Sequence, residues 1–106
     1  MADEKQIERI RRMEARLIEA EAAVRTFSDA RERFAAAQRS LWELDAYLGS
    51  EDWRQDREAD ETGRLPSDLR RGVLSEDGIY DLLDDNREEM RAALLMAAEY
   101  FGEMLK

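Results

Sequence analysis

Apolar residues recur at alternating spacings of three and four along the first 48 residues of the chain. Two successive runs show this spacing, one over residues 10–27 and the other over residues 27–48. In an α-helix such spacing places every member of a run on one face, as in coiled coils. The runs consist of Ile10, Met13, Leu17, Ala20, Val24 and Phe27, then Phe27, Ala30, Phe34, Ala37, Leu41, Leu44 and Leu48. Because neither glycine nor proline interrupts this part, the pattern predicts amphipathic helix throughout it.

The two apolar runs meet out of phase, since Val24, Phe27 and Ala30 are spaced three and three. A discontinuity of this kind either overwinds a continuous helix or marks a break. Thr26 and Ser28 favour a break, because either can cap a new helix. An unbroken helix would also be roughly 65 Å long, whereas a compact domain of this size has a radius of gyration of about 13 Å.

We therefore expect an all-α protein built as an antiparallel helical hairpin or bundle, with long helices over about 3–26 and 28–48. The alternative is one continuous, coiled-coil-like helix over 3–48, which would pair with another chain.

Residues 49–75 differ from the helical parts, because they hold the only proline and three of the five glycines. Gly49 is placed to end the preceding helix as a C′ residue. A short helical turn is expected over residues 51–60, and a single turn over residues 66–71. The pattern thus predicts an ordered irregular segment between helices.

A further helix is predicted over about 76–104. Ser75 provides a capping hydroxyl, and two acidic residues follow it at the positive end of the helix dipole. The expected apolar face consists of Ile79, Leu82, Leu83, Met90, Ala93, Leu94, Ala97 and Phe101. No linker is evident, so residues 1–106 are expected to form a single helical domain.

The chain has a formal net charge of −9, and its acidity is uneven. Residues 1–48 contain ten acids and nine bases, whereas residues 49–106 contain sixteen acids and eight bases. Such a surface repels phosphate groups, so neither nucleic acid nor an anionic membrane is expected as a partner. The longest apolar run, residues 92–98, is too short to span a membrane, and no signal segment is recognisable. A cytoplasmic location is expected.

Histidine and cysteine are both missing from the composition. This removes the usual zinc ligands, the cysteine nucleophile and the side chain that normally titrates near neutral pH. Ser75 is therefore expected to act as a helix cap rather than as a nucleophile, since no histidine or nearby lysine can activate it.

Carboxylates provide the remaining candidate chemistry. Asp77, Asp81, Asp84 and Glu88 form one helical stripe, which is typical of a solvated outer face. A calcium loop starting at Asp56 fails, because its sixth position is Glu61 rather than glycine and its twelfth is Ser67 rather than glutamate. We expect no metal, no cofactor and no catalytic residue. The alternative is a divalent-metal-dependent hydrolase, with ligands from Glu58, Glu61, Asp81 and Asp84.

Aromatic residues gather in and around the irregular segment, namely Trp42, Tyr47, Trp53 and Tyr80. They could line a pocket or interface, but fastening the segment to the helices is the favoured interpretation, since long loops in small domains must pack. The charged residues of the segment exceed what packing requires. The candidate interaction surface is Trp53, Asp56, Asp60, Glu61, Asp68, Arg71 and Asp77.

One stretch of about forty residues is distinctive, YLGSEDWRQDREADETGRLPSDLRRGVLSEDGIYDLLDDNRE at residues 47–88. It resembles the signature region of domain-of-unknown-function family 4298 (DUF4298). The matching positions are Trp53, Asp56, Asp60, Glu61, Gly63, Leu65, Pro66, Asp68, Leu69, Arg71, Gly72, Val73, Leu74, Ser75, Glu76 and Asp77. The resemblance implies a small, cytoplasmic, all-helical bacterial protein without an assigned activity, and it supplies no catalytic residue.

These observations together favour a non-enzymatic protein-interaction module or a self-associating helical module. The expected partner is a protein or a second copy of the chain.

Overall fold

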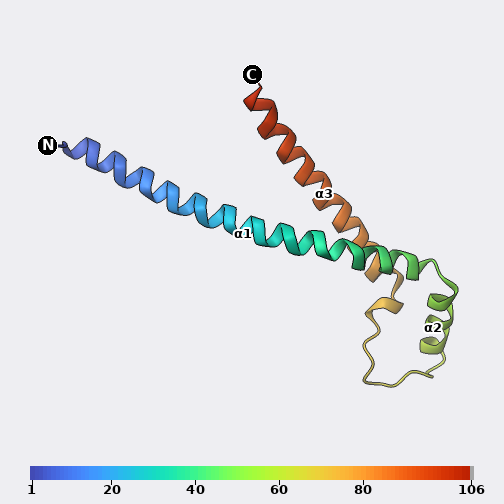
Figure 1. The fold of residues 1–106 in the computed structure, drawn as a ribbon. Coiled ribbons are helices and arrows are strands. Elements are labelled where there is room, and N and C mark those ends of the chain that lie inside the picture. Colours follow the sequence, from blue (N-terminus) through green and yellow to red (C-terminus); the bar gives the residue numbers. More distant parts are fainter. Residues whose placement is uncertain (106) are drawn as a thin grey trace. The chain divides into compact units, whose positions relative to one another are not determined.

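The computed structural model describes residues 1–105 and contains only helices, turns and loops within that range (Figure 1). Its elements are α1 (Glu4–Leu48), α2 (Glu51–Glu61), the 3-10 helix η1 (Gly72–Leu74) and α3 (Glu76–Met104). The predicted all-α class is confirmed, as are the short helix carrying Trp53 and the long final helix.

Helix α1 runs without interruption for 45 residues (Figure 1). The predicted break between residues 26 and 28 is therefore wrong, and the alternative of one continuous helix is confirmed. Thr26 and Ser28 are only modestly unfavourable inside a helix, and no glycine or proline forces a stop. The helix begins after Asp3, whose carboxylate accepts a hydrogen bond from the Gln6 backbone N–H at 2.7 Å.

The chain divides into two compact units, Met1–Gln38 and Arg39–Lys106. Helix α1 contributes to both units, and the single domain over 1–106 stays a prediction. In the first unit, nearly every side chain is exposed.

The second unit holds the buried core, which is small. Four hydrophobic side chains are between 3% and 8% exposed, and each comes from a different helical element. They are Leu41 of α1, Trp53 of α2, Leu74 of η1 and Ile79 of α3. Burial of each stabilises the fold by about 1.5–3 kcal/mol. The irregular segment is thus packed through η1, as the apolar residues of the segment predict.

The ends of α2 are fixed by local hydrogen bonds. At its start, the Trp53 backbone N–H donates to the Ser50 hydroxyl at 3.2 Å. At its end, Gly63 adopts a left-handed φ of 69°, and its N–H donates to the Asp60 carbonyl at 3.1 Å. The next N–H, from Arg64, donates to the Ala59 carbonyl at 2.9 Å, which completes a Schellman motif.

Gly49 does follow the last residue of α1, but it lacks the left-handed conformation expected of a C′ glycine. Among the described residues only Gly63 has a positive φ, so the left-handed glycine stop belongs to α2.

The path from α2 to α3 contains a turn and a 3-10 helix. The turn over residues 66–69 is closed by the Leu69 N–H and the Pro66 carbonyl at 3.2 Å, where the sequence predicts one helical turn. Ser75 caps α3 as predicted, because its hydroxyl accepts from the Gly78 N–H at 3.3 Å. A Cβ atom at Gly78 would lie only 3.0 Å from the Gly72 carbonyl, so a glycine there lets η1 approach the first turn of α3.

Candidate interaction surface

Trp53 fastens the irregular segment to α2. Its side chain is buried, and its indole Nε1–H donates to the backbone carbonyl of Val73 at 2.8 Å. The guanidinium of Arg57 lies 5.4 Å from the centre of the Trp53 rings, within cation–π range. Arg57 also pairs with Glu61 at 3.0 Å and lies 3.8 Å from a carboxylate oxygen of Glu76 at the start of α3. This cluster therefore joins α2, η1 and α3.

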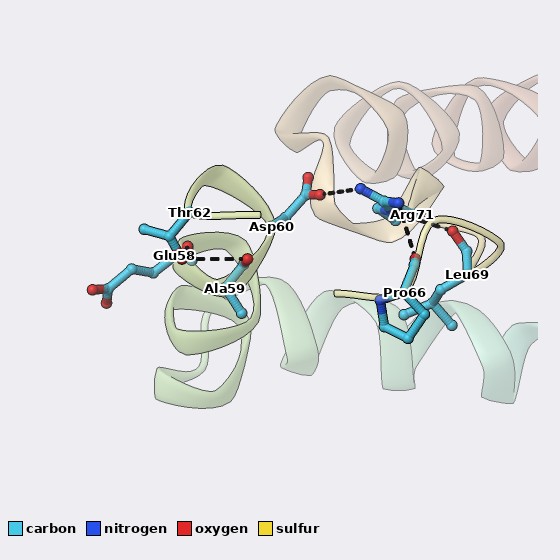
Figure 2. Close-up of polar contacts among 7 residues, drawn as sticks. All are labelled: Glu58, Ala59, Asp60, Thr62, Pro66, Leu69 and Arg71. Carbon is cyan, nitrogen blue, oxygen red and sulfur yellow. Dashed lines mark hydrogen bonds and ion pairs between the residues drawn. The ribbon is translucent and has the colours of Figure 1, made fainter. Parts of the chain in front are cut away.

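Arg71 connects the irregular segment to the end of α2 (Figure 2). Its Nη1 donates to the Asp60 carboxylate at 2.7 Å, while Nη2 donates to the Pro66 carbonyl at 3.0 Å and Nε to the Leu69 carbonyl at 3.3 Å. The side chains of Arg71 and Asp60 are each only about a third exposed. A partly screened pair with several hydrogen bonds is stronger than an ordinary surface ion pair. One guanidinium thus connects the end of α2 to the turn over residues 66–69.

Tyr47 and Asp56 connect the end of α1 to α2. The Tyr47 hydroxyl donates to a carboxylate oxygen of Asp56 at 2.6 Å. Burial, this hydrogen bond and the negative charges of Asp56 and Asp52 raise the pKa of Tyr47 to about 12. The hydroxyl therefore remains a hydrogen-bond donor throughout the physiological range.

Most residues of the predicted interaction surface are buried in the second unit or contact other residues of it. Trp53 is buried, and Asp56, Asp60, Glu61 and Arg71 contact other residues of the same chain. Asp68 and Asp77 are exposed, on the turn and in the first turn of α3. The structure brings Asp60 and Arg71 together, and a role of this surface in recognition stays a prediction.

The structure exposes two apolar faces that the site prediction does not include. On α1, five side chains of the first apolar run are between 50% and 69% exposed, namely Ile10, Met13, Leu17, Val24 and Phe27. On the second half of α3, six more are between 55% and 71% exposed, namely Leu94, Leu95, Met96, Tyr100, Phe101 and Met104. The spacing of these residues is visible in the sequence. A hairpin formed by a break in α1 would bury the α1 residues in a core, so they are not predicted to be exposed.

Surface hollows are shallow where they occur on α1. One is lined by Ala20, Glu21, Val24, Arg25, Ser28 and Asp29, and another by Asp29, Glu32, Arg33 and Ala36. Side chains of one helix cannot surround a small molecule, which normally needs a concave site.

Carboxylates are the remaining candidate metal ligands. Within residues 1–105, no group of three or more acidic side chains is arranged so that it could hold a metal ion. The same range contains no helix that is both long and apolar enough to cross a bilayer.

The structure therefore defines a class of small all-helical proteins with long, exposed amphipathic helices. A comparison with protein families identifies the group more closely. The family described as "Domain of unknown function (DUF4298)" matches residues 10–96, so the chain belongs to this family. No curated protein and no solved structure matches the chain significantly.

Proposed function

We propose that this protein is a non-enzymatic, cytoplasmic helical module that works by associating with a protein through its exposed apolar helix faces. The partner is another protein or a second copy of the chain. The observation that carries the proposal is the exposure of large apolar side chains along α1 and the second half of α3.

The contrast between the two stripes of α1 supports this proposal. Leu41, in the second stripe, is 7% exposed, whereas Val24, in the first, is 69% exposed. Both stripes have the spacing of helix-packing faces. The part of the second stripe that lies in the second unit, Leu41, Leu44 and Leu48, is buried or half-buried. Contiguous exposed apolar surface of this kind marks protein–protein contact sites in soluble proteins.

The energetics of the helix point the same way. Most of the stability of a protein helix comes from packing its apolar face, and isolated helices in water are marginal. The first unit consists of one helix whose large apolar side chains are exposed. A partner helix on this face would supply the packing that the first unit lacks.

The alternative, a carboxylate-based metal-dependent hydrolase, requires acids from several elements to converge on one ion. Glu58 and Glu61 lie on α2, and Asp81 and Asp84 lie on α3, without forming a group of that kind in the described range. Thermal melting with magnesium, manganese or calcium separates the two functions. The interaction module predicts an unchanged melting temperature, and a rise with one of these ions would favour the hydrolase.

The proposal is tested by paired substitutions on each exposed face. Leu17→Glu with Val24→Glu changes the α1 face, and Leu94→Glu with Phe101→Glu changes the α3 face. Arg25→Glu is a control that adds negative charge to α1 away from the apolar stripe. Each tagged variant is compared with wild type in solution mass and in co-purification from a bacterial lysate.

Association that is lost with one face pair and retained with the control supports the proposal, since a buried charge on an apolar interface is costly. Association that survives both face pairs would contradict it, as would a wild-type chain that binds neither itself nor any protein.

A further inference from the structure

We infer that the partner of the α1 face is a second copy of this chain, bound as a parallel, in-register coiled coil over residues 9–27. The inference rests on the proposed function, because it names the partner for one of the exposed faces. It comes from where the charged residues of α1 lie relative to the exposed apolar stripe.

The stripe fixes a heptad register on α1. Ile10, Leu17 and Val24 occupy the a positions, and Met13, Ala20 and Phe27 occupy the d positions. Two of these a residues, Ile10 and Val24, are β-branched, a residue type common at the a positions of parallel dimers. The large side chains at these a and d positions are all at least half exposed. The seam that the a and d residues form is therefore accessible to a second helix.

Charged residues flank this seam in a pattern that selects orientation. Arg9 and Arg16 lie at g positions, and Glu14 and Glu21 lie at e positions. In a parallel coiled coil, a g residue faces the e residue five positions later on the other helix. Arg9 therefore faces Glu14 of the second copy, and Arg16 faces its Glu21. By symmetry the dimer gains four pairs of opposite charge.

The antiparallel arrangement would reverse these interactions. There g positions face g positions and e positions face e positions. Arginines would meet arginines and glutamates would meet glutamates, which destabilises the pairing. The charges of α1 thus favour the parallel arrangement specifically.

The exposed half of α3 lacks such a pattern. With Met90 and Ala97 at a positions, the g residues Glu89 and Met96 face the e residues Leu94 and Phe101. Neither pair is of opposite charge. Residues 49–106 also carry sixteen acids against eight bases, whereas residues 1–48 are nearly neutral with ten against nine. Self-pairing therefore meets less repulsion along α1 than along α3.

The change of phase in α1 sets the end of the seam. Val24, Phe27 and Ala30 are separated by two consecutive spacings of three residues, where the regular pattern would alternate three and four. This irregularity rotates the apolar stripe by about 60° around the helix. Beyond this point the stripe leads to Leu41, which is buried in the second unit. One helix can therefore present one face to a second copy and an adjacent, rotated face to its own core.

Existing contacts do not prevent the pairing. Arg16 lies 3.2 Å from Glu19 on the same helix, but both side chains are about two-thirds exposed. Such a pair contributes little, so Arg16 can exchange it for Glu21 of the second copy at low cost.

Single cysteines test the register, since the chain has no cysteine of its own. Met13→Cys and Ala20→Cys place the thiol at d positions of the seam. Ala22→Cys is the matched control at the outward f position. Each full-length variant is oxidised at a concentration where its wild-type parent is dimeric, and the disulfide-linked dimer is measured on a denaturing gel.

We expect linked dimer from both seam variants and little from the control, because d residues face each other only in a parallel dimer. An antiparallel pair cannot align residue 13 with itself and residue 20 with itself at once. Linkage at only one of the two sites, or equal linkage at position 22, would overturn the inference while leaving association as such intact.

Charge reversal gives a second measurement that introduces no cysteine. R9E/R16E and E14R/E21R should each weaken self-association by roughly 30-fold or more, because attractive pairs become repulsive. An equimolar mixture of the two variants should restore it. Self-association of R9E/R16E as strong as that of wild type would rule out the parallel pairing. A wild-type monomer that binds another protein through the α1 face would refute the second copy as partner, but not the proposed function.

Discussion

Trp53 links α2 to η1 directly and to α3 through Arg57. Its ring is buried, its indole N–H binds η1 at Val73, and its face contacts Arg57, which in turn approaches α3. A recognition residue would be expected to present its ring to solvent. The geometry instead assigns Trp53 to stability, and this assignment can be measured because the chain has only two tryptophans.

Trp53→Phe should lower the free energy of unfolding by about 1–3 kcal/mol, since it removes packing and leaves the Val73 carbonyl without its donor. The measurement is urea denaturation followed by circular dichroism. The fluorescence of the variant should come from Trp42 alone, which is 74% exposed, and should therefore be red-shifted. Trp42→Phe is the control and should leave both stability and a blue-shifted emission from Trp53. Equal stability losses in the two variants would contradict the assignment.

Arg71→Met should loosen the irregular segment, because the guanidinium holds Asp60 and two carbonyls of the turn. We expect faster amide hydrogen exchange over residues 64–71 and a loss of about 1–2 kcal/mol in stability. The neighbouring Arg70 is exposed, so Arg70→Met removes the same charge without these contacts. Exchange rates that rise equally in both variants would show that charge alone, and not the bonding of Arg71, orders the segment.

Tyr47 predicts a pH dependence at the alkaline end. Its pKa is raised from an ordinary 10.0 to about 12, so its contribution to stability is complete below pH 10 and is lost as the pH rises towards 12. Wild type should therefore lose stability over this window, whereas Tyr47→Phe should be less stable by about 1 kcal/mol at pH 8 and should lack that fall. Urea unfolding between pH 8 and pH 11.5 measures both effects. A parallel loss in wild type and variant would mean that Tyr47 is not the titrating group.

At the scale of elements, the sequence predicts a helix correctly where a single local interaction sets where the helix begins. Ser75 caps α3 as its hydroxyl predicts, and α2 carries Trp53 as expected. The predicted break in α1 is wrong, because α1 is continuous. A residue that can cap a helix permits a new helix to begin but does not force the preceding helix to end. The 3-10 helix η1 was not predicted, since it depends on the packing of Leu74 into the core rather than on a local signal.

The sequence predicts which residue types the candidate site contains, but not how these residues are arranged in space. The sequence shows that Asp60 and Arg71 are charged, but not that they lie 2.7 Å apart across eleven residues of chain. It likewise shows the apolar stripe of α1, but not that Val24 is exposed while Leu41 is buried. Exposure depends on which elements meet, and that is decided by tertiary packing.

Gly63 tests the assignment of the left-handed helix stop. Gly63→Ala should destabilise the fold by about 1 kcal/mol, because a Cβ atom strains a φ of 69°. Gly102→Ala is the control of opposite sign, since Gly102 lies within α3 with open space around it and should gain a few tenths of a kcal/mol from alanine. Thermal unfolding of the two variants compares them directly. A neutral Gly63→Ala would show that the Schellman motif does not set the end of α2.

At the scale of the whole molecule, two properties have to be reconciled. The chain has a formal net charge of −9, which favours solubility, and only four buried hydrophobic side chains in the described residues. A core of that size leaves many large apolar side chains of α1 and α3 in water. Association through those faces would bury them without requiring a larger domain, which is how amphipathic helices of other proteins pair.

If the exposed helix faces are association faces and a second copy covers the one on α1, the chain is a dimer in solution. Sedimentation equilibrium of the purified wild-type chain tests this most directly. We predict a mass of about twice 12.4 kDa at high micromolar concentration, and a return to the monomer mass when Leu17→Glu and Val24→Glu are combined. A wild-type mass of 12.4 kDa at every concentration, up to the high micromolar range, would contradict pairing of two copies.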